Sequence, residues 1–97
     1  MKDQVIVITG ATDGIGKVAA RELSKKGYAT VLVGRNIRKL ESTKEEFLKL
    51  NPQALITIFQ ADLSLLKETK RVGKEILNKF PKIYCLLNNA GAFFADR

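Results

Sequence analysis

Four short hydrophobic runs alternate along this sequence with three longer segments whose hydrophobic residues recur at helical spacing. The first and last runs are continuously apolar, which is typical of strands buried on both faces. The predicted strands are 5–8, 29–33, 55–59 and 83–87, and the predicted helices are 14–26, 38–50 and 64–79. This order requires parallel strands joined by right-handed crossovers, with helices on both faces. The sequence therefore predicts an α/β fold, a doubly wound parallel sheet in three layers (α/β/α), with residues 1–97 forming an incomplete half-domain.

Each predicted helix has an apolar face and recognisable ends. Glycine after two lysines ends the first helix at Gly27, Asn51-Pro52 ends the second, and Asp62 or Ser64 is expected to cap the third. The residues expected on the apolar faces are Ile15, Val18, Ala19 and Leu23 in the first helix, Leu40, Phe47 and Leu50 in the second, and Leu65, Leu66, Thr69, Val72, Gly73, Ile76 and Leu77 in the third.

A glycine-rich turn follows the first predicted strand directly. Residues 9–16 read Thr-Gly-Ala-Thr-Asp-Gly-Ile-Gly, with the spacing G-x-x-x-G-x-G. Gly10 permits a tight turn, Gly14 lets the backbone approach a diphosphate, and Gly16 allows close packing of helix on strand. Main-chain N–H groups at the helix start then face the anion. An ordinary glycine-rich turn is the alternative, but the position between a buried strand and an amphipathic helix favours nucleotide binding.

The residues after the second predicted strand indicate which dinucleotide, NAD(H) or NADP(H), the chain would bind. A NAD-binding fold places an acidic residue there for the ribose 2′-hydroxyl, whereas this chain has Arg35. An arginine fork suits a 2′-phosphate, and Lys39 would add a point charge. The alternative is a solvated charge cluster, although cations are unfavourable at a helix start. Asp13 argues the other way, because its carboxylate would repel a 2′-phosphate. The pattern favours NADP(H), with NAD(H) as the alternative.

Four motifs together resemble the classical short-chain dehydrogenase/reductases, and most of all their retinol-dehydrogenase-like branch. They are Thr-Gly-x-x-x-Gly-Ile-Gly at 9–16, Gly-Arg-Asn at 34–36, Asp-Leu-Ser at 62–64 and Asn-Asn-Ala-Gly at 88–91. The resemblance covers essentially the whole chain. It implies a Rossmann-like fold and, in the complete family member, hydride transfer between an alcohol and a carbonyl, on a lipophilic substrate such as a retinoid or steroid.

The resemblance also implies roles for individual residues. Asp62 would accept a hydrogen bond from the adenine amino group, with Leu63 beside the ring, and a cap role for Asp62 is compatible with this. The turn after the fourth strand would line the cofactor near its ribose. The residues predicted to bind the cofactor are Gly10, Thr12, Asp13, Gly14, Ile15, Gly16, Arg35, Lys39, Asp62, Leu63, Asn89, Ala90 and Gly91.

No catalytic residue is predicted. The catalytic Ser and Tyr-x-x-x-Lys pair that the family implies would follow the Asn-Asn-Ala-Gly turn, and this sequence stops at Arg97. Its two tyrosines, Tyr28 and Tyr84, are followed four residues later by Leu32 and Asn88. We therefore expect the chain to be a truncated product or fragment that is inactive alone.

Composition limits the other function classes. The chain has no histidine, which excludes His-based triads and metal sites, and no metal site is predicted. The single cysteine, Cys85, is expected to be buried and reduced, and the first apolar run is too short for a signal peptide or a membrane span, so we expect a cytoplasmic protein. The net charge of +7 is spread over separate helices without an arginine-rich arm, which argues against a nucleic-acid partner.

The fourth predicted strand, 83–87, indicates a binding partner in addition to the dinucleotide. With no fifth strand in the sequence to pair with, it would leave an apolar sheet edge open. We expect a complementary C-terminal segment or another chain at that edge. The alternative function is a non-catalytic nucleotide-binding or protein-interaction module that uses the edge.

Overall fold

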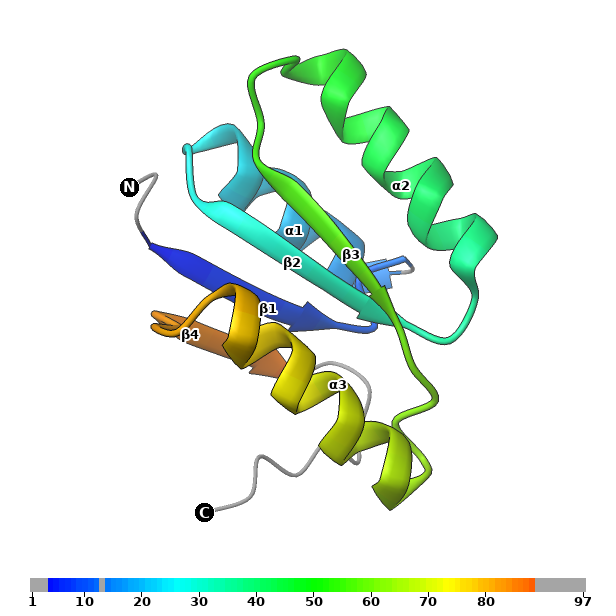
Figure 1. Ribbon diagram of the computed structural model, residues 1–97. Helices are drawn as coiled ribbons and strands as arrows, with labels where there is room; N and C mark the ends of the chain where they lie inside the picture. The colour runs from blue at the N-terminus through cyan, green and yellow to red at the C-terminus, as the bar shows by residue number, and fades with distance from the viewer. Residues whose placement is uncertain (1–3, 13, 89–97) are drawn as a thin grey trace.

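The computed structural model describes residues 4–12 and 14–88, and within them the elements alternate as the sequence predicts. In chain order they are β1 (Val5–Thr9), α1 (Gly14–Lys25), β2 (Ala29–Gly34), α2 (Ile37–Leu50), β3 (Ile56–Gln60), α3 (Leu66–Lys79) and β4 (Cys85–Asn88). The strands form a parallel sheet in the order β3-β2-β1-β4 (Figure 1). The predicted doubly wound α/β fold is confirmed.

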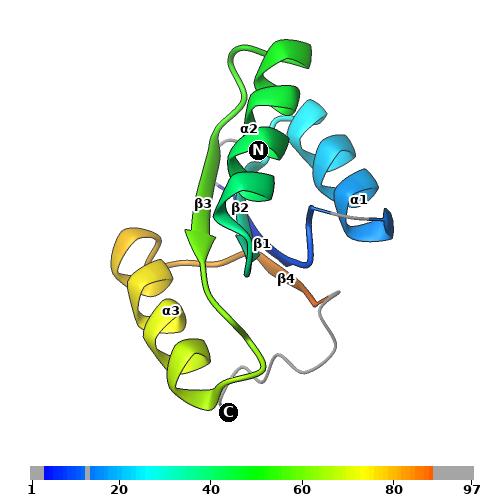
Figure 2. The same cartoon turned by 90° about the vertical axis from the view of Figure 1, so that its right-hand side faces the viewer.

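The sheet is the middle layer of three. Helices α1 and α2 cover one face and α3 covers the other (Figure 2). Alternate strand residues therefore supply two cores, one on each face. The core under α1 and α2 includes Ile8, Leu32 and Phe47, whereas the core under α3 includes Val31 and Ile76. Because β1 and β2 are buried on both faces, every residue of 5–9 and 29–33 is buried, which explains their continuously apolar sequences.

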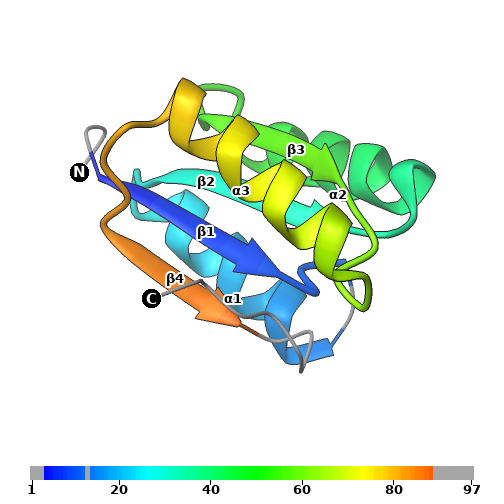
Figure 3. The same ribbon diagram turned by 60° about the horizontal axis from the view of Figure 1, so that its bottom comes forward.

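The connections reverse direction next to β1. From β1 the chain moves outward through β2 to β3, and then crosses back to place β4 on the other side of β1 (Figure 3). In sheets of this kind, ligands bind outside the carboxyl ends of the strands, near such a reversal. The carboxyl ends of β1, β2 and β3 are in register, with Thr9 opposite Val33 and Gly34 opposite Gln60.

The fourth strand begins later than predicted, at Cys85 rather than at residue 83. The main-chain N–H of Tyr84 donates to the carbonyl of Val5, but the Tyr84 ring lies outside the strand and stacks on Tyr28 with 6.1 Å between ring centroids. Cys85 is half-buried, not buried, since it lies at the start of a strand that pairs with β1 alone among the described residues.

The expected apolar face of α1 is wrong for Ile15 and Val18, whereas Leu23 is partly buried and packs against the core. The helix buries Gly16, Ala20 and Ser24, a line of small residues at a spacing of four, whereas Ile15 is 82% exposed and Val18 is 50% exposed. Small side chains let the helix axis approach the sheet closely, and this approach turns the larger side chains to the flanks. The end of α1 is as predicted: Gly27 has φ 97° and its N–H donates to the carbonyl of Ser24.

The apolar faces of α2 and α3 are narrower than predicted. Leu40 and Phe47 are buried in α2, but Leu50 is exposed. Helix α3 buries Thr69, Val72 and Ile76 and exposes Leu66 and Leu77, and Leu65, just before the helix, is exposed as well. A helix lying on a flat sheet buries only the stripe that faces it, and this stripe is narrower than the full apolar arc of α3.

The expected cap of α3 is also wrong. The residue in the N-cap position is Leu65, which makes no side-chain capping bond. Asp62 accepts from the main-chain N–H of Ser64 instead, so both predicted caps belong to the turn before the helix. Within the described residues, no helix is both long enough and apolar enough to cross a bilayer.

Candidate functional site

A cleft with a volume of about 410 Å³ lies at the carboxyl ends of β1, β2 and β3. Its position follows from the fold, because the loops after these three strands leave the sheet at the same edge. The residues that line it are Gly10, Thr12, Val33, Gly34, Arg35, Asn36, Lys39, Ala61, Asp62, Leu63 and Ser64. Six of the predicted binding residues are brought together here, namely Gly10, Thr12, Arg35, Lys39, Asp62 and Leu63.

The turn between β1 and α1 forms one side of the cleft. Gly10 has φ 65°, and its N–H donates to the carbonyl of Val33 at 3.2 Å, which joins the turn to the end of β2. Gly14 has φ 55° at the first position of α1, and a Cβ there would meet nothing within 4 Å. Both glycines adopt the left-handed conformation that other residues rarely take. The backbone is therefore open to a ligand at the positive end of the helix dipole.

The segment after β2 supplies the positive charge. Asn36 caps α2, because its Oδ1 accepts from the N–H groups of Arg38 at 3.0 Å and Lys39 at 3.2 Å. The cap fixes where α2 begins, and it leaves Arg35 and Lys39 on the cleft with exposed side chains. Asn36 also lines the cleft; it belongs to the Gly-Arg-Asn motif at 34–36, but no binding role was predicted for it. Its position immediately before a segment with helical spacing indicated an N-cap role.

The segment after β3 supplies the opposite charge. The hydroxyl of Ser64 donates to Oδ1 of Asp62 at 2.6 Å, and the Ser64 N–H donates to the same atom at 3.0 Å. These two bonds, together with the positive charge of Arg35, lower the pKa of Asp62. Asp62 is therefore ionised near neutral pH and acts as an acceptor. The N–H of Ala61 donates to the carbonyl of Gly34 at 2.9 Å, so the two loops leave the sheet side by side.

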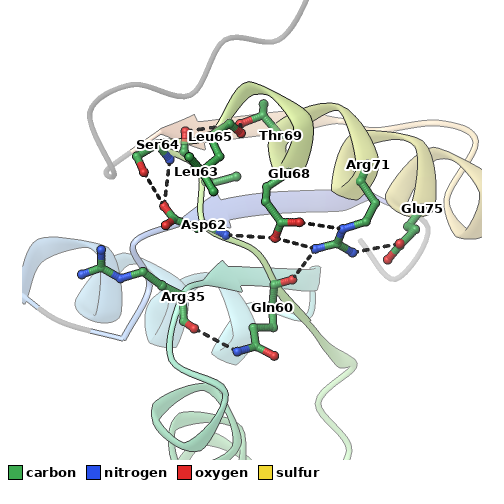
Figure 4. A network of polar contacts seen from close by, with 10 residues as sticks. All are labelled: Arg35, Gln60, Asp62, Leu63, Ser64, Leu65, Glu68, Thr69, Arg71 and Glu75. Atoms are coloured by element: carbon green, nitrogen blue, oxygen red, sulfur yellow. Dashed lines mark hydrogen bonds and ion pairs between the residues drawn. The ribbon is translucent and has the colours of Figure 1, made fainter.

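A network of polar side chains outside the cleft contacts both of these loops (Figure 4). Arg71 in α3 donates to Glu68 at 3.0 Å, to Glu75 at 2.9 Å and to the main-chain carbonyl of Gln60 at 2.9 Å. The bonds to these carboxylates raise the pKa of Arg71, and the bonds from Arg71 lower that of Glu68. This network was not predicted from the sequence, where only the helical spacing of Glu68, Arg71 and Glu75 indicated ion pairs.

Among the described residues, Gly14, Ile15 and Gly16 were also predicted to bind the cofactor, and they do not line the cleft. Gly14 and Gly16 belong to the first turn of α1, with Gly16 buried against the sheet. The Ile15 side chain is exposed beside them. Asp13, Asn89, Ala90 and Gly91 lie outside the described residues, and their roles stay predictions. In the part of the chain that the structure describes, no group of three or more acidic, histidine or cysteine side chains is placed to hold a metal ion.

Comparison with known proteins identifies the family. The family model described as short chain dehydrogenase matches residues 4–96, which is nearly the whole chain. This chain belongs to the short-chain dehydrogenase family. Among curated relatives, the short-chain dehydrogenase TIC 32 A of Brassica napus is 36% identical over 96% of this chain and 29% of its own length. Retinol dehydrogenase 12 of Mus musculus is 35% identical over 91% of this chain and 28% of its own length.

Solved structures of short-chain dehydrogenases share the fold. A metagenomic short-chain oxidoreductase in complex with NADP is 31% identical, with a TM-score of 0.86 over 94% of this chain and 40% of that one. The chain spans between a quarter and a third of the length of curated relatives that it matches, from 25% to 32%. The Rossmann-like fold and the resemblance to retinol dehydrogenases that the sequence indicated are confirmed.

Proposed function

We propose that this chain is the dinucleotide-binding portion of a short-chain oxidoreductase and that its cleft prefers NADP(H) to NAD(H). The observation that carries the proposal is the position of Arg35 at the end of β2, on the same cleft wall as Lys39. An acidic residue at this place would favour the free 2′-hydroxyl of NAD(H), and Arg35 stands there instead. The family's solved oxidoreductase with NADP is consistent with this choice.

The residues of the cleft fit such a cofactor. Main-chain N–H groups at the start of α1 would hold the diphosphate, where the open space above Gly14 lets it approach. The guanidinium of Arg35 would pair with the 2′-phosphate, and Lys39 would add a second positive charge. Asp62 would accept a hydrogen bond from the adenine amino group, and Leu63 would lie along the ring. The nicotinamide of the bound cofactor supplies the hydride chemistry.

Interconversion of an alcohol and a carbonyl is proposed for a longer protein that contains this portion. The retinol and steroid dehydrogenases among the relatives suggest a lipophilic substrate. We also propose that a complementary segment or another chain covers the outer edge of β4, where Leu86 is 37% exposed. A cytoplasmic location stays a prediction from the sequence.

Calorimetric titration of the chain with NADP⁺ and NAD⁺ tests the proposal. We expect saturable binding that favours NADP⁺, and Arg35→Ala is expected to weaken NADP⁺ binding about 10- to 100-fold with little change for NAD⁺, because it removes charge-assisted hydrogen bonds. Arg21→Ala, which removes the same charge from α1, is the control. Equal affinity for the two dinucleotides would overturn the NADP(H) preference.

A second candidate function is an interaction module without catalytic activity. The free edge of β4 favours it, since this strand pairs only with β1 among the described residues. A folded chain that binds neither dinucleotide would support this candidate over the first.

A further inference from the structure

The carbonyl of Arg35 is held by a side chain from the neighbouring strand. Gln60, the last residue of β3, lies opposite Gly34 in the sheet register, and its Nε2 donates to the Arg35 carbonyl at 3.1 Å. This carbonyl belongs to the loop after β2, beyond the regular ladder of the sheet. Figure 4 shows the carbonyl turned toward Gln60 while the guanidinium of Arg35 extends the other way. The bond made by Gln60 therefore fixes the peptide group that follows Arg35.

Gln60 is itself held by α3. Its main-chain carbonyl accepts from Nη2 of Arg71 at 2.9 Å, and the Arg71 guanidinium is fixed between Glu68 and Glu75. Oε1 of Glu68 also accepts a longer bond, 3.4 Å, from the main-chain N–H of Asp62. One network on α3 thus contacts the loop that carries Arg35, through Gln60, and the loop that carries Asp62, through Glu68.

The chemistry of the network suggests a geometric role. All its side chains are at least partly exposed to solvent, and exposed ion pairs contribute little to the free energy of unfolding, because water screens them and long side chains lose entropy. Three of its bonds nevertheless end on main-chain atoms of Arg35, Gln60 and Asp62. Fixing these atoms restricts the two loops that carry the opposite charges of the cleft.

We propose that Gln60 and Arg71 are positioning residues that hold Arg35 in the orientation needed to discriminate the 2′-phosphate of NADP(H). The inference rests on the proposed function, and it adds two residues outside the cleft to those that set the cofactor preference. Neither residue lines the cleft, so neither is expected to contact the dinucleotide. Each acts through the loop after β2, where a free peptide group would let the guanidinium of Arg35 sample directions that miss the phosphate.

The test compares the ratio of NAD⁺ to NADP⁺ dissociation constants in matched variants. Gln60→Met keeps the length of the side chain and removes the donor to Arg35. We expect it to weaken NADP⁺ binding about fivefold, the worth of one hydrogen bond, and to leave NAD⁺ binding unchanged. Arg71→Met should lower the ratio in the same direction. Gln53→Met, in the turn before β3 at the opposite end of the sheet, is the control and should leave the ratio unchanged.

A second readout separates positioning from a general loss of structure. The amide resonance of Asn36 reports the peptide group whose carbonyl Gln60 holds, so it should shift in Gln60→Met while the amide resonances of β1 remain in place. If the unmodified chain prefers NADP⁺ and Gln60→Met keeps that preference, the inference is overturned and the proposed function stands. If the unmodified chain binds neither dinucleotide, the proposed function fails, and the positioning role falls with it.

Discussion

Ser64 donates two hydrogen bonds to a single oxygen of Asp62, one from its hydroxyl at 2.6 Å and one from its main-chain N–H at 3.0 Å. Both bonds stabilise the ionised carboxylate, and the nearby charge of Arg35 acts in the same direction. The carboxylate that is proposed to meet the adenine amino group is thereby kept charged and fixed in direction. Neither residue caps α3, because the N-cap position of the helix is Leu65 and both side chains belong to the turn before it.

Replacing Ser64 by Ala should raise the pKa of Asp62 toward its ordinary value. The hydroxyl is the larger of the two Ser64 contributions, and the main-chain bond remains in the variant. Because the pKa of Asp62 is lowered in the folded chain, its ionised form stabilises the fold above the ordinary pKa, and this stabilisation is lost as the pH falls through the folded value. With Ala at 64, the Asp62 contribution becomes smaller, and it is completely lost at a higher pH than in the unmodified chain because the folded pKa is higher.

Carboxyl ¹³C resonances followed against pH measure this change directly. Ser42→Ala, on the exposed side of α2, is the matched control and should leave the Asp62 titration as it was. An unchanged Asp62 midpoint in Ser64→Ala would show that the hydroxyl bond does not set this pKa.

Substitution by alanine should lower the free energy of unfolding at one glycine, Gly14, and raise it at another, Gly73. Gly14 has φ 55°, where alanine is strained, so Gly14→Ala is expected to destabilise the fold by about 1–2 kcal/mol, although a Cβ there has open space. Gly73 lies inside α3, and a Cβ there also meets nothing within 4 Å. Gly73→Ala should therefore stabilise the fold by about 0.5–1 kcal/mol, because alanine loses less backbone entropy in a helix.

Urea unfolding followed by circular dichroism measures both changes. The comparison needs no other control, since the two substitutions add the same methyl group without a clash. Destabilisation of similar size at both positions would contradict the assigned backbone conformations.

Replacing Ile76 or Leu77, two adjacent apolar residues of α3, by alanine should lower the free energy of unfolding by very different amounts. Ile76 is 2% exposed and Leu77 is 52% exposed. Ile76→Ala removes buried methylene groups and leaves a cavity, at a cost of about 2–5 kcal/mol, whereas Leu77→Ala should cost about 1 kcal/mol or less. A loss of the larger size is a large part of the total stability of about 5–15 kcal/mol that is usual for a domain.

Chemical denaturation measures the free energy of unfolding of the two variants. Glycerol or sucrose can be added if Ile76→Ala is marginally folded. Equal losses at positions 76 and 77 would mean that Leu77 is also covered, and that α3 lies on the sheet with a different face.

The order of elements was predictable because burial on both faces leaves a continuous apolar signature in β1 and β2. Strand ends were less predictable: Tyr84 reads as a strand residue, yet it stacks on Tyr28, a contact between residues far apart in the sequence. The predicted apolar face of α1 was wrong for Ile15 and Val18 for a related reason. Periodicity indicates where large apolar residues recur. Close approach of the helix to the sheet instead buries the line of small residues Gly16, Ala20 and Ser24.

The candidate site also contains residues that were predictable from the sequence and residues that only the structure reveals. Gly10 and Arg35 were identifiable because each follows a buried strand, and the carboxyl ends of parallel strands share one edge. Gln60 and Arg71 carry no such signature. Their relation to Arg35 appears only when β3 lies against β2 and α3 brings Arg71 over the end of β3.

The sequence by itself determined the α/β alternation, the glycine turn and the family, because these depend on local patterns of burial and on backbone conformations that only glycine adopts readily. Only the tertiary structure decided which side of each helix meets the sheet and which polar groups bridge the loops of the cleft. Both depend on how closely elements from different parts of the chain approach one another, and that distance is set by packing across the whole fold.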